Sequence, residues 1–262
     1  MSIEEQREVG PRWWRYVYRV PLLAGHLLIT LPITLLAINP LGQRVPVGNE
    51  SLTEAMIRFW SRLLCRIFGI RVRCVGTLRP GPVMLLANHI SWIDIEVIHS
   101  LRAASFVAKA EIARWPVVGW LARAGGTVFH DRGSDASRHA VTEALAEKLR
   151  GGHSVAIFPE GRTGDGARVL PFHGRMLKAA IDTETPVQPI ALAFLRDGRL
   201  CNTEVAFRDG EHFLGNLWRL LGEAPIDVEV VCAPPRPSAD GQRRDLARGA
   251  HDVVVQALEA RQ

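Results

Sequence analysis

Cysteine is scarce in this chain of 262 residues, and its four copies lie far apart. They form no CxxC pair and no spacing typical of a zinc site or a disulfide framework: Cys65, Cys74, Cys201 and Cys232. Zinc-finger, helix-turn-helix and RNA-binding sheet signatures are also absent, which argues against a nucleic-acid partner. We interpret the cysteines as small core residues of a protein in a reducing compartment.

Charge is missing altogether from residues 20–43, a segment rich in leucine and isoleucine. This length is enough to reach across or deep into a bilayer. Pro21 and Pro32 interrupt it, so we expect a kinked or re-entrant helix rather than a regular spanning one. A signal peptide is the alternative. The long aromatic region before the segment and the lack of a clear cleavage site argue against that alternative.

The net charge of +5 and the isoelectric point near 9.4 suit an acidic partner, either nucleic acid or an anionic membrane surface. Arg12, Arg15 and Arg19 alternate with tryptophan and tyrosine directly before the apolar segment. This pattern is typical of an aromatic belt at a membrane interface, with arginines that extend toward lipid phosphates. The sequence therefore favours a membrane.

A second helix is expected to begin with a capping box at Ser51–Glu54. It carries Arg58, Arg62 and Arg66 on one face, which favours a position in the membrane interface over a solvated face of a soluble helix. Residues 1–70 are accordingly interpreted as N-terminal membrane-associating helices, and residues 71–262 as a catalytic domain.

From residue 71 onward, short apolar runs alternate with helical patterns. The expected strands are 71–75, 82–87, 104–108, 126–130, 154–158, 187–195 and 226–232. The expected helices are 92–101, 111–124, 134–150, 173–183, 211–221 and 241–260. This alternation predicts an α/β fold with a mostly parallel sheet flanked by helices. The apolar stripe within 213–221 is interpreted as core rather than as a second membrane contact.

His89 and Asp94 are the strongest candidates for chemistry, because they follow the apolar run 82–87. Ligands of open α/β sheets bind where strands end, so His89 would emerge at that edge. A histidine there can accept a proton from a hydroxyl, and a nearby carboxylate can orient the imidazole. No serine or cysteine nucleophile stands at a fixed spacing, which favours a base acting directly on a substrate hydroxyl.

Three further segments border expected strands, so all could meet at the same edge. The segment 125–132 ends in Arg132, which can hold a phosphate or a carboxylate. The segment 155–166 contains Glu160, Gly161 and Arg162 in a glycine-rich turn that can approach an anion. The segment 185–190 opens a strand with two prolines, and we expect it to form a wall.

Together these segments resemble the glycerolipid (lysophospholipid) acyltransferase family. Its blocks N-H-x4-D, G-x-x-F-x-x-R, F-P-E-G and V-x-P-I occur in order at residues 88–94, 126–132, 158–161 and 187–190. The resemblance covers roughly residues 70–195. The helical pair before it is also similar to the membrane-docking element of bacterial members.

The resemblance implies transfer of an acyl group from a thioester of acyl carrier protein or coenzyme A to a lysolipid hydroxyl. His89 would be the general base and Asp94 would orient it. Arg132, Glu160, Gly161 and Arg162 would bind the polar head of the acceptor. No metal or prosthetic group is expected, because the thioester already activates the acyl carbon. The enzyme would lie on the bacterial inner membrane with its active site on the cytoplasmic face, and both ends of the apolar segment would stay on that side.

Lysophosphatidic acid, the commoner acceptor of the family, is the first expectation, with phosphatidic acid as the product. Two departures from the family pattern weaken it: Gly161-Arg162-Thr163-Gly164-Asp165 replaces the usual G-T-R-S, and His173 stands where lysine is usual. Lyso-ornithine lipid is the alternative acceptor, because a carboxylate such as Asp165 suits its ammonium group. A non-catalytic lipid-binding protein and a hydrolase are the remaining alternatives, and the complete motifs argue against both.

Overall fold

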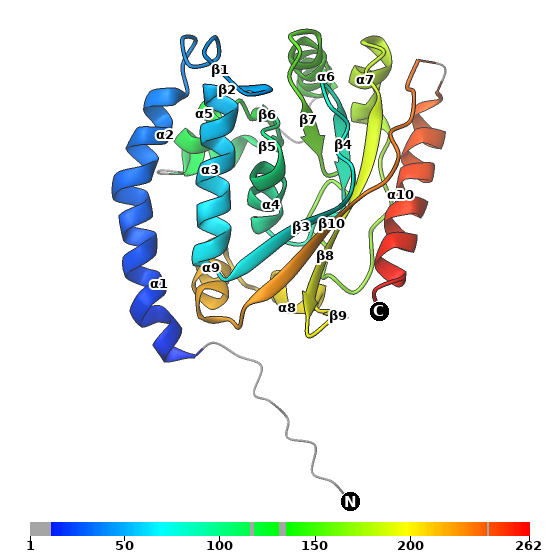
Figure 1. Ribbon diagram of the computed structural model, residues 1–262. Coiled ribbons are helices and arrows are strands. Elements are labelled where there is room, and N and C mark those ends of the chain that lie inside the picture. The colour runs from blue at the N-terminus through cyan, green and yellow to red at the C-terminus, as the bar shows by residue number, and fades with distance from the viewer. Residues whose placement is uncertain (1–11, 116–117, 131–134, 240) are drawn as a thin grey trace, which may run out of the picture.

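The computed structural model describes residues 12–115, 118–130, 135–239 and 241–262 (Figure 1). Five strands form a twisted central sheet in the order β3 (Ile70–Gly76), β10 (Ile226–Cys232), β8 (Val187–Arg196), β4 (Met84–Ala87) and β7 (Val155–Ile157), and β9 (Arg199–Leu200) extends β8 as a short hairpin. The pairs β3/β10, β8/β4 and β4/β7 are parallel, whereas β10/β8 and β8/β9 are antiparallel. The expected mostly parallel α/β fold is confirmed.

Two more parallel strands continue the sheet beyond β7. Ser105 forms a parallel bridge to Val155, and the chain runs from there into β5 (Val107–Lys109), which pairs with β6 (Val128–His130). The strands β4, β7, β5 and β6 therefore run in one direction, and their carboxyl ends lie along one edge. Chemical groups that follow these strands collect at that edge.

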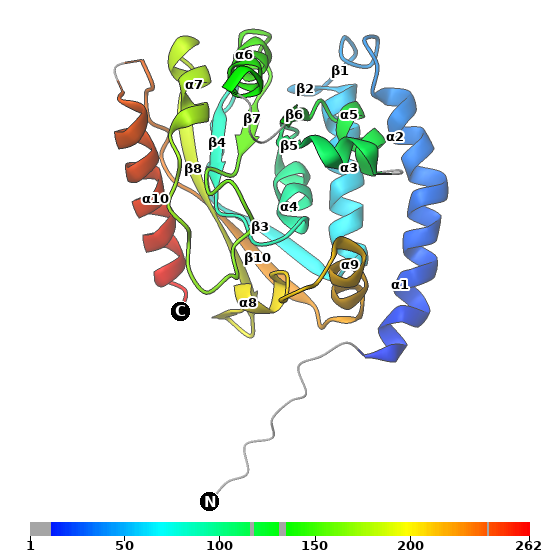
Figure 2. The same ribbon diagram turned by 180° about the vertical axis from the view of Figure 1, so that it is seen from behind.

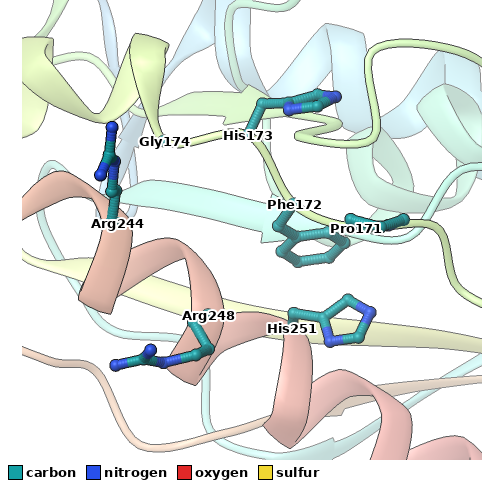
Figure 3. A pocket seen from close by; sticks show the side chains of 7 residues that line it. All are labelled: Pro171, Phe172, His173, Gly174, Arg244, Arg248 and His251. Carbon is teal, nitrogen blue, oxygen red and sulfur yellow. The ribbon is translucent and has the colours of Figure 1, made fainter.

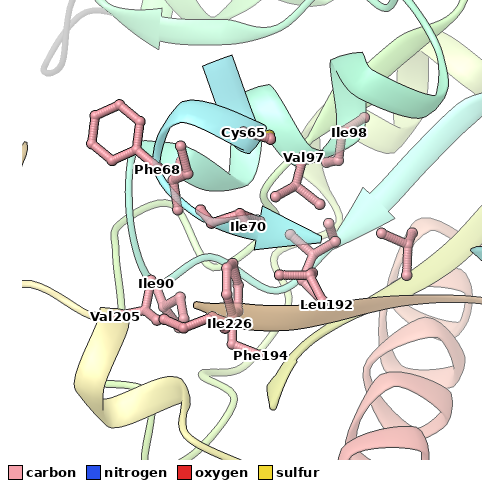
Figure 4. Close-up of a cluster of buried hydrophobic side chains, with 14 of the residues drawn as sticks. Cys65, Phe68, Ile70, Ile90, Val97, Ile98, Leu192, Phe194, Val205 and Ile226 are labelled. Carbon is pink, nitrogen blue, oxygen red and sulfur yellow. The ribbon is translucent and has the colours of Figure 1, made fainter. Parts of the chain in front are cut away.

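Helices cover both faces of the sheet. On one face α3 (Leu52–Ile67), α4 (Ile93–Leu101) and α9 (Phe213–Gly222) pack on the larger apolar cluster, part of which is drawn in Figure 4. On the other face α6 (Asp135–Arg150), α7 (Lys178–Asp182) and α10 (Arg243–Glu259) cover two smaller clusters. Because both faces are covered, β8 is buried over almost its whole length and reads as a continuous apolar run.

The remaining elements are short. The expected helix 111–124 is a 3-10 turn at Ala110–Arg114 followed by α5 (Val118–Ala124), and the expected helix 173–183 is a 3-10 turn at Arg175–Leu177 that leads into α7. The hairpin of β1 (Pro46–Val47) and β2 (Glu50–Ser51), the strand β9 and the helix α8 (Asn202–Val205) were not expected. Elements of two to four residues are too short to show a periodic pattern.

The apolar N-terminal segment is one continuous helix. It consists of α1 (Trp13–Gly25), a π-helical turn (His26–Thr30) and α2 (Leu31–Ala37). The N–H of Leu31 donates to the carbonyl of His26, five residues back, so the backbone widens just before Pro32. This adjustment accommodates a residue that has no N–H to donate. The 25-residue helix is long and apolar enough to cross a membrane by length and composition.

The polarity of this helix is inverted relative to a helix on the surface of a soluble protein. Its side facing the domain is mostly polar: Arg15, Arg19, His26 and Thr34 are buried. Its outward side exposes large apolar residues along the whole length: Trp13, Trp14, Val17, Tyr18, Val20, Leu22, Leu27, Leu28, Ile29, Ile33 and Leu36. A helix in water turns its apolar face inward, so this arrangement fits a lipid environment on the outside.

Two arginines of the predicted interfacial belt do not extend toward lipid. Arg15 donates to the carbonyl of Gly222 over 2.8 Å, and Arg19 donates to the carbonyls of Leu221 and Glu223 over 2.9 Å each. These carbonyls lie at the end of α9, where the helix dipole attracts cations. The expectation of an outward-facing belt is wrong for both residues, because the end of α9 supplies closer acceptors.

The second helix begins as expected. The side chain of Ser51 accepts from the N–H of Glu54, and the carboxylate of Glu54 accepts from the N–H of Ser51. Its arginine stripe is partly occupied within the protein, since Arg58 pairs with Glu50 over 2.8 Å and Arg62 donates to the carbonyl of Ser100 over 2.7 Å. The first contact is local to the start of the helix, and the second joins the helix to α4.

Candidate active site

The strand β4 delivers His89 to the carboxyl edge of the sheet. Asn88, the residue before it, is buried and fastens the end of the strand to β8: its side chain donates to the carbonyl of Leu192 over 3.1 Å and accepts from the N–H of Leu192 over 2.8 Å. The asparagine thus replaces a backbone pairing at the point where the chain leaves the sheet. His89 follows with its side chain 17% exposed.

Asp94 holds the imidazole of His89 from behind. Nδ1 of His89 lies 2.8 Å from Oδ2 of Asp94, and the same oxygen accepts the N–H groups of Ile90 and Ser91 over 2.7 and 2.9 Å. Asp94 is fully buried in the first turn of α4, where the helix dipole favours a negative charge. With a proton on Nδ1, the lone pair of Nε2 is available as a base. The expected pair is therefore assembled.

Glu160 holds the backbone of the same turn. Its Oε1 accepts the N–H of His89 over 2.8 Å and its Oε2 accepts the N–H of Leu170 over 3.0 Å. Burial raises the pKa of its carboxyl to about 7, against the opposing effect of these two hydrogen bonds. Phe158, just before it in the chain, stacks on the imidazole of His89 with ring centroids 3.9 Å apart. The F-P-E-G block therefore supports His89 directly.

The loop after Glu160 returns to His89 as well. The N–H of Gly164 donates to the carbonyl of His89 over 2.7 Å. Asp165 is exposed and its carboxylate accepts the N–H of Ala167 over 3.0 Å, which forms a local turn. Gly166 has φ of 80°, and a Cβ there would collide with the backbone of Asn202. The pair Asp165-Gly166, which departs from the usual family pattern, thus shapes a loop that passes against the start of α8 at Asn202.

Gly161 and Arg162 lie at the start of this loop. Gly161 adopts φ of 72°, its N–H donates to the carbonyl of Phe158 over 3.0 Å, and both Gly161 and Arg162 are exposed. Arg162 can therefore meet a ligand that approaches from solvent. Arg132, the other predicted cation, lies outside the described residues. The strand β6 before it ends at the same edge as β4 and β7.

The fourth sequence block runs along the whole of β4 and reaches this edge only with its last residue, Ile190, which pairs with Ala87. Val187 pairs with Met84 at the beginning of β4, and Gln188 pairs with Leu85. A segment that opens a parallel strand lies at its amino end, whereas the groups that follow strands lie at the carboxyl end. Gln188 is fully buried and bonds to the backbone of Arg79, Thr77 and Ala233. The beginning of this segment therefore has a structural role away from the edge, and only its end at Ile190 meets the other segments.

Asn216 on α9 completes the support of the His89 turn, and the sequence motifs did not reveal it. Its Oδ1 accepts from Oγ of Ser91 over 3.2 Å and from Nε1 of Trp92 over 3.0 Å, and its amide donates to Glu211 over 2.9 Å. Hydrogen bonds from Arg219 lower the pKa of Glu211 to about 2. The only sequence signal was a polar residue within the apolar stripe 213–221.

A cleft of about 360 Å³ adjoins the F-P-E-G turn on the side of α10 (Figure 3). The N–H of His173 donates to the carbonyl of Pro159 over 2.9 Å, which joins the wall of the cleft to that turn. The lining is apolar on one side and cationic on the other: Pro171, Phe172, His173, Gly174, Arg244, Arg248 and His251. Arg248 also pairs with Asp245 over 2.7 Å. Within the described ranges, no three side chains of His, Cys, Asp or Glu are grouped as metal ligands.

Comparisons with known proteins agree with this geometry. The sequence model of the family described as Acyltransferase matches residues 70–193. A lyso-ornithine lipid O-acyltransferase from Pseudomonas aeruginosa is 36% identical over 245 residues, which cover 93% of each chain. A 1-acyl-sn-glycerol-3-phosphate acyltransferase from Neisseria meningitidis is 32% identical over 214 residues, which cover 80% of this chain and 82% of the relative.

Among solved structures, the 1-acyl-sn-glycerophosphate acyltransferase PlsC from Thermotoga maritima is similar in fold, with a TM-score of 0.68. The match covers 94% of this chain and 97% of that chain, at 19% sequence identity. The two proteins therefore share a fold over nearly their whole length.

Proposed function

Because this chain belongs to the acyltransferase family, we propose that it transfers a fatty acyl group from a thioester to the free hydroxyl of a lysolipid. The observation that carries the proposal is the pair His89–Asp94, with Nδ1 held by a buried carboxylate and Nε2 left for a substrate. This arrangement suits a base that acts on a hydroxyl without a covalent enzyme intermediate.

In the proposed reaction, Nε2 of His89 takes the proton of the acceptor hydroxyl as its oxygen attacks the thioester carbonyl carbon. Asp94 stabilises the imidazolium that forms. When the tetrahedral intermediate collapses, the C–S bond breaks and the leaving thiolate takes the proton back from His89. The products are an ester and a free thiol. No metal or prosthetic group takes part, because the thioester supplies the activation.

The roles of the remaining residues follow from their contacts. Both oxygens of Glu160 are bound to backbone N–H groups, so Glu160 acts mainly by positioning His89. Arg162 is exposed beside the site, and together with Gly161 and Arg132 it is proposed to contact the polar head of the acceptor.

Lyso-ornithine lipid is the acceptor that we place first. The relative with that name aligns over 93% of this chain at 36% identity, whereas the relative named for 1-acyl-sn-glycerol-3-phosphate aligns over 80% at 32%. The exposed carboxylate of Asp165 beside the site suits a cationic head. Lysophosphatidic acid is the second candidate, supported by the relatives from Neisseria and by the exposed Arg162.

We further propose that the enzyme sits on one face of a bacterial inner membrane, the cytoplasmic one, where acyl carrier protein and coenzyme A thioesters are found. Arg19 near one end of the N-terminal helix bonds to α9, and the carbonyl of Ala37 at the other end accepts from Thr53 of α3 over 2.7 Å. A helix whose two ends touch the same domain keeps both ends on the same side of the bilayer as that domain.

The test offers purified full-length protein one labelled acyl thioester together with lysophosphatidic acid and lyso-ornithine lipid in vesicles. Acyl carrier protein and coenzyme A thioesters are compared as donors. Labelled ornithine lipid is the expected product. Labelled phosphatidic acid alone would support the second candidate. Free fatty acid released faster than either ester forms would indicate a hydrolase, and binding of lipid without turnover would indicate a non-catalytic protein.

A further inference from the structure

The helix α9 exposes two large apolar side chains. Leu214 is 64% exposed and Trp218 is 55% exposed, and they lie one turn apart on the same side of the helix. Phe213 and Leu217 are partly buried, and Leu220 is buried. The apolar stripe expected to be core is therefore divided, with one part in the domain and another part on the surface.

This exposed part is continuous with the N-terminal helix. The ring of Trp218 stacks on Tyr16 of α1 with centroids 4.7 Å apart, and the hydroxyl of Tyr16 donates to the carbonyl of Trp218 over 3.2 Å. Figure 2 shows α9 beside the beginning of α1. Because Arg15 and Arg19 also bond to the end of α9, the two surfaces are held as one rigid unit.

The surface continues through Phe213 to Trp115, and a second tryptophan, Trp120, follows on α5, which packs on the turn that ends at Arg114. The ring of Trp115 lies 5.4 Å from that of Phe213, and Trp120 on α5 is 52% exposed. Two exposed arginines, Arg114 and Arg123, flank them in the chain. Exposed tryptophan next to arginine is the composition that proteins use at the boundary between lipid headgroups and acyl chains.

We propose that Trp115, Trp120, Leu214 and Trp218, here called the α9–α5 surface, form a second contact with the lipid bilayer beside the N-terminal helix. The inference rests on the proposed membrane function of that helix. A bilayer is the occupant that fits, because the surface adjoins a helix that exposes apolar residues over its whole length. Its arginines match the negative charge of bacterial phospholipid headgroups.

This second contact places the catalytic turn near the membrane. Phe213 of α9 also touches Trp92, with ring centroids 5.5 Å apart, and Trp92 belongs to the turn that carries His89. Seating α9 on the lipid therefore brings that turn close to the headgroup layer. A lysolipid could then offer its hydroxyl to His89 while its acyl chain stays in the bilayer.

The test attaches an environment-sensitive fluorophore to full-length protein at Leu214→Cys or Trp120→Cys, in a Cys74→Ser background. Leu28→Cys reports on the N-terminal helix, and Gln256→Cys on the exposed side of α10 is the control. Vesicles of phosphatidylethanolamine and phosphatidylglycerol carry doxyl-labelled lipid as a quencher. We expect quenching at positions 28, 214 and 120, and none at 256.

Quenching at 28 without quenching at 214 and 120 would overturn the second contact and leave the docking of the helix intact. Lack of quenching at 28 as well would overturn both. A fluorescence shift at 214 that depends on protein concentration without vesicles would show that a second copy covers the surface, which also overturns the inference.

Leu214→Glu tests the consequence for catalysis. An acid in the first turn of α9 is favoured by the helix dipole, so the fold should persist. Transfer to an acceptor in vesicles should fall about tenfold, because a large apolar contact is lost. Transfer to a short-chain, water-soluble acceptor should not change. Gln256→Glu makes the same change in charge and should alter neither rate. Equal loss on both acceptors, or no loss on either, would contradict the inference.

Discussion

The N–H of His89 donates to Oε1 of Glu160 over 2.8 Å, and this bond joins two segments that lie 71 residues apart in the chain. The carbonyl of His89 accepts from Gly164 of the same loop over 2.7 Å. The base is therefore held from three sides: its backbone by the loop after β7, its ring face by Phe158 and its Nδ1 by Asp94. A base fixed in this way has little orientational freedom left to lose when substrate binds.

Asp94→Asn should reduce turnover strongly while leaving the protein folded. An asparagine oxygen in place of Oδ2 can still accept from Ile90, Ser91 and Nδ1 of His89, but the neutral amide no longer stabilises the imidazolium that forms during transfer. By analogy with other carboxylate–histidine pairs, we expect kcat to fall by about 10³-fold. Steady-state kinetics and thermal unfolding measure the two effects separately. Turnover within tenfold of the wild type would mean that the charge of Asp94 does not assist the base.

Glu160→Gln should change how stability depends on pH. The pKa of Glu160 is raised from 4.5 to about 7 in the folded protein, so between these values the unfolded chain loses the proton that the folded protein keeps. The contribution of Glu160 to stability is therefore full below 4.5 and is lost as the pH rises through 7. We expect the wild type to lose more stability than the variant between about pH 5 and about pH 8.

Thermal unfolding at both pH values measures this difference. Glu143→Gln is the matched control, because Glu143 is exposed on α6. Equal pH dependence in the wild type and Glu160→Gln would show that the buried carboxyl does not titrate in this range.

Asn216→Ala should weaken the turn that carries His89. The substitution removes the acceptor of Ser91 and Trp92, which leaves two donors at a buried position. We expect a loss of about 1–3 kcal/mol in the free energy of unfolding and a lower kcat. In a Trp92→Phe background the same substitution should cost less, because one donor is already gone. Strict additivity in this double-mutant cycle would argue against the coupling.

Arg19→Met should release the N-terminal helix from α9. The guanidinium is almost fully buried and donates two hydrogen bonds to carbonyls, so its loss should cost about 3 kcal/mol. Gly69 has φ of 76°, and a Cβ there would collide with this guanidinium, so Gly69→Ala should act in the same direction. Arg12→Met, at an exposed position, is the control. Hydrogen exchange of α1 should rise in the first two variants and stay unchanged in the third.

Local patterns predicted much of this architecture. The alternation of apolar runs predicted all seven expected strands, and the Ser51–Glu54 spacing predicted the start of a helix. The five-residue spacing of His89 and Asp94 predicted that these two side chains form a pair. Each of these relationships acts within one element or one turn.

Relationships between distant segments could not be predicted in this way. Asn216 supports Ser91 across 125 residues, and no periodic pattern in the sequence records that contact. The prediction that Arg15 and Arg19 face lipid was wrong for a related reason. A residue pattern shows which side chains alternate, but it does not show that the end of α9 supplies hydrogen-bond acceptors nearby. The order of blocks also could not show that Val187 lies beside the beginning of β4, whereas His89 follows its end.

The most direct test of the account is acyl transfer by His89→Ala, measured with a labelled thioester and lyso-ornithine lipid in vesicles. His139→Ala at an exposed position of α6 is the matched control. We expect His89→Ala to lose activity by about 10²-fold to 10⁴-fold, while it still binds vesicles and unfolds at the temperature of the wild type. His139→Ala should stay near the wild-type rate. Transfer by His89→Ala within a few-fold of the wild type would contradict His89 as the general base.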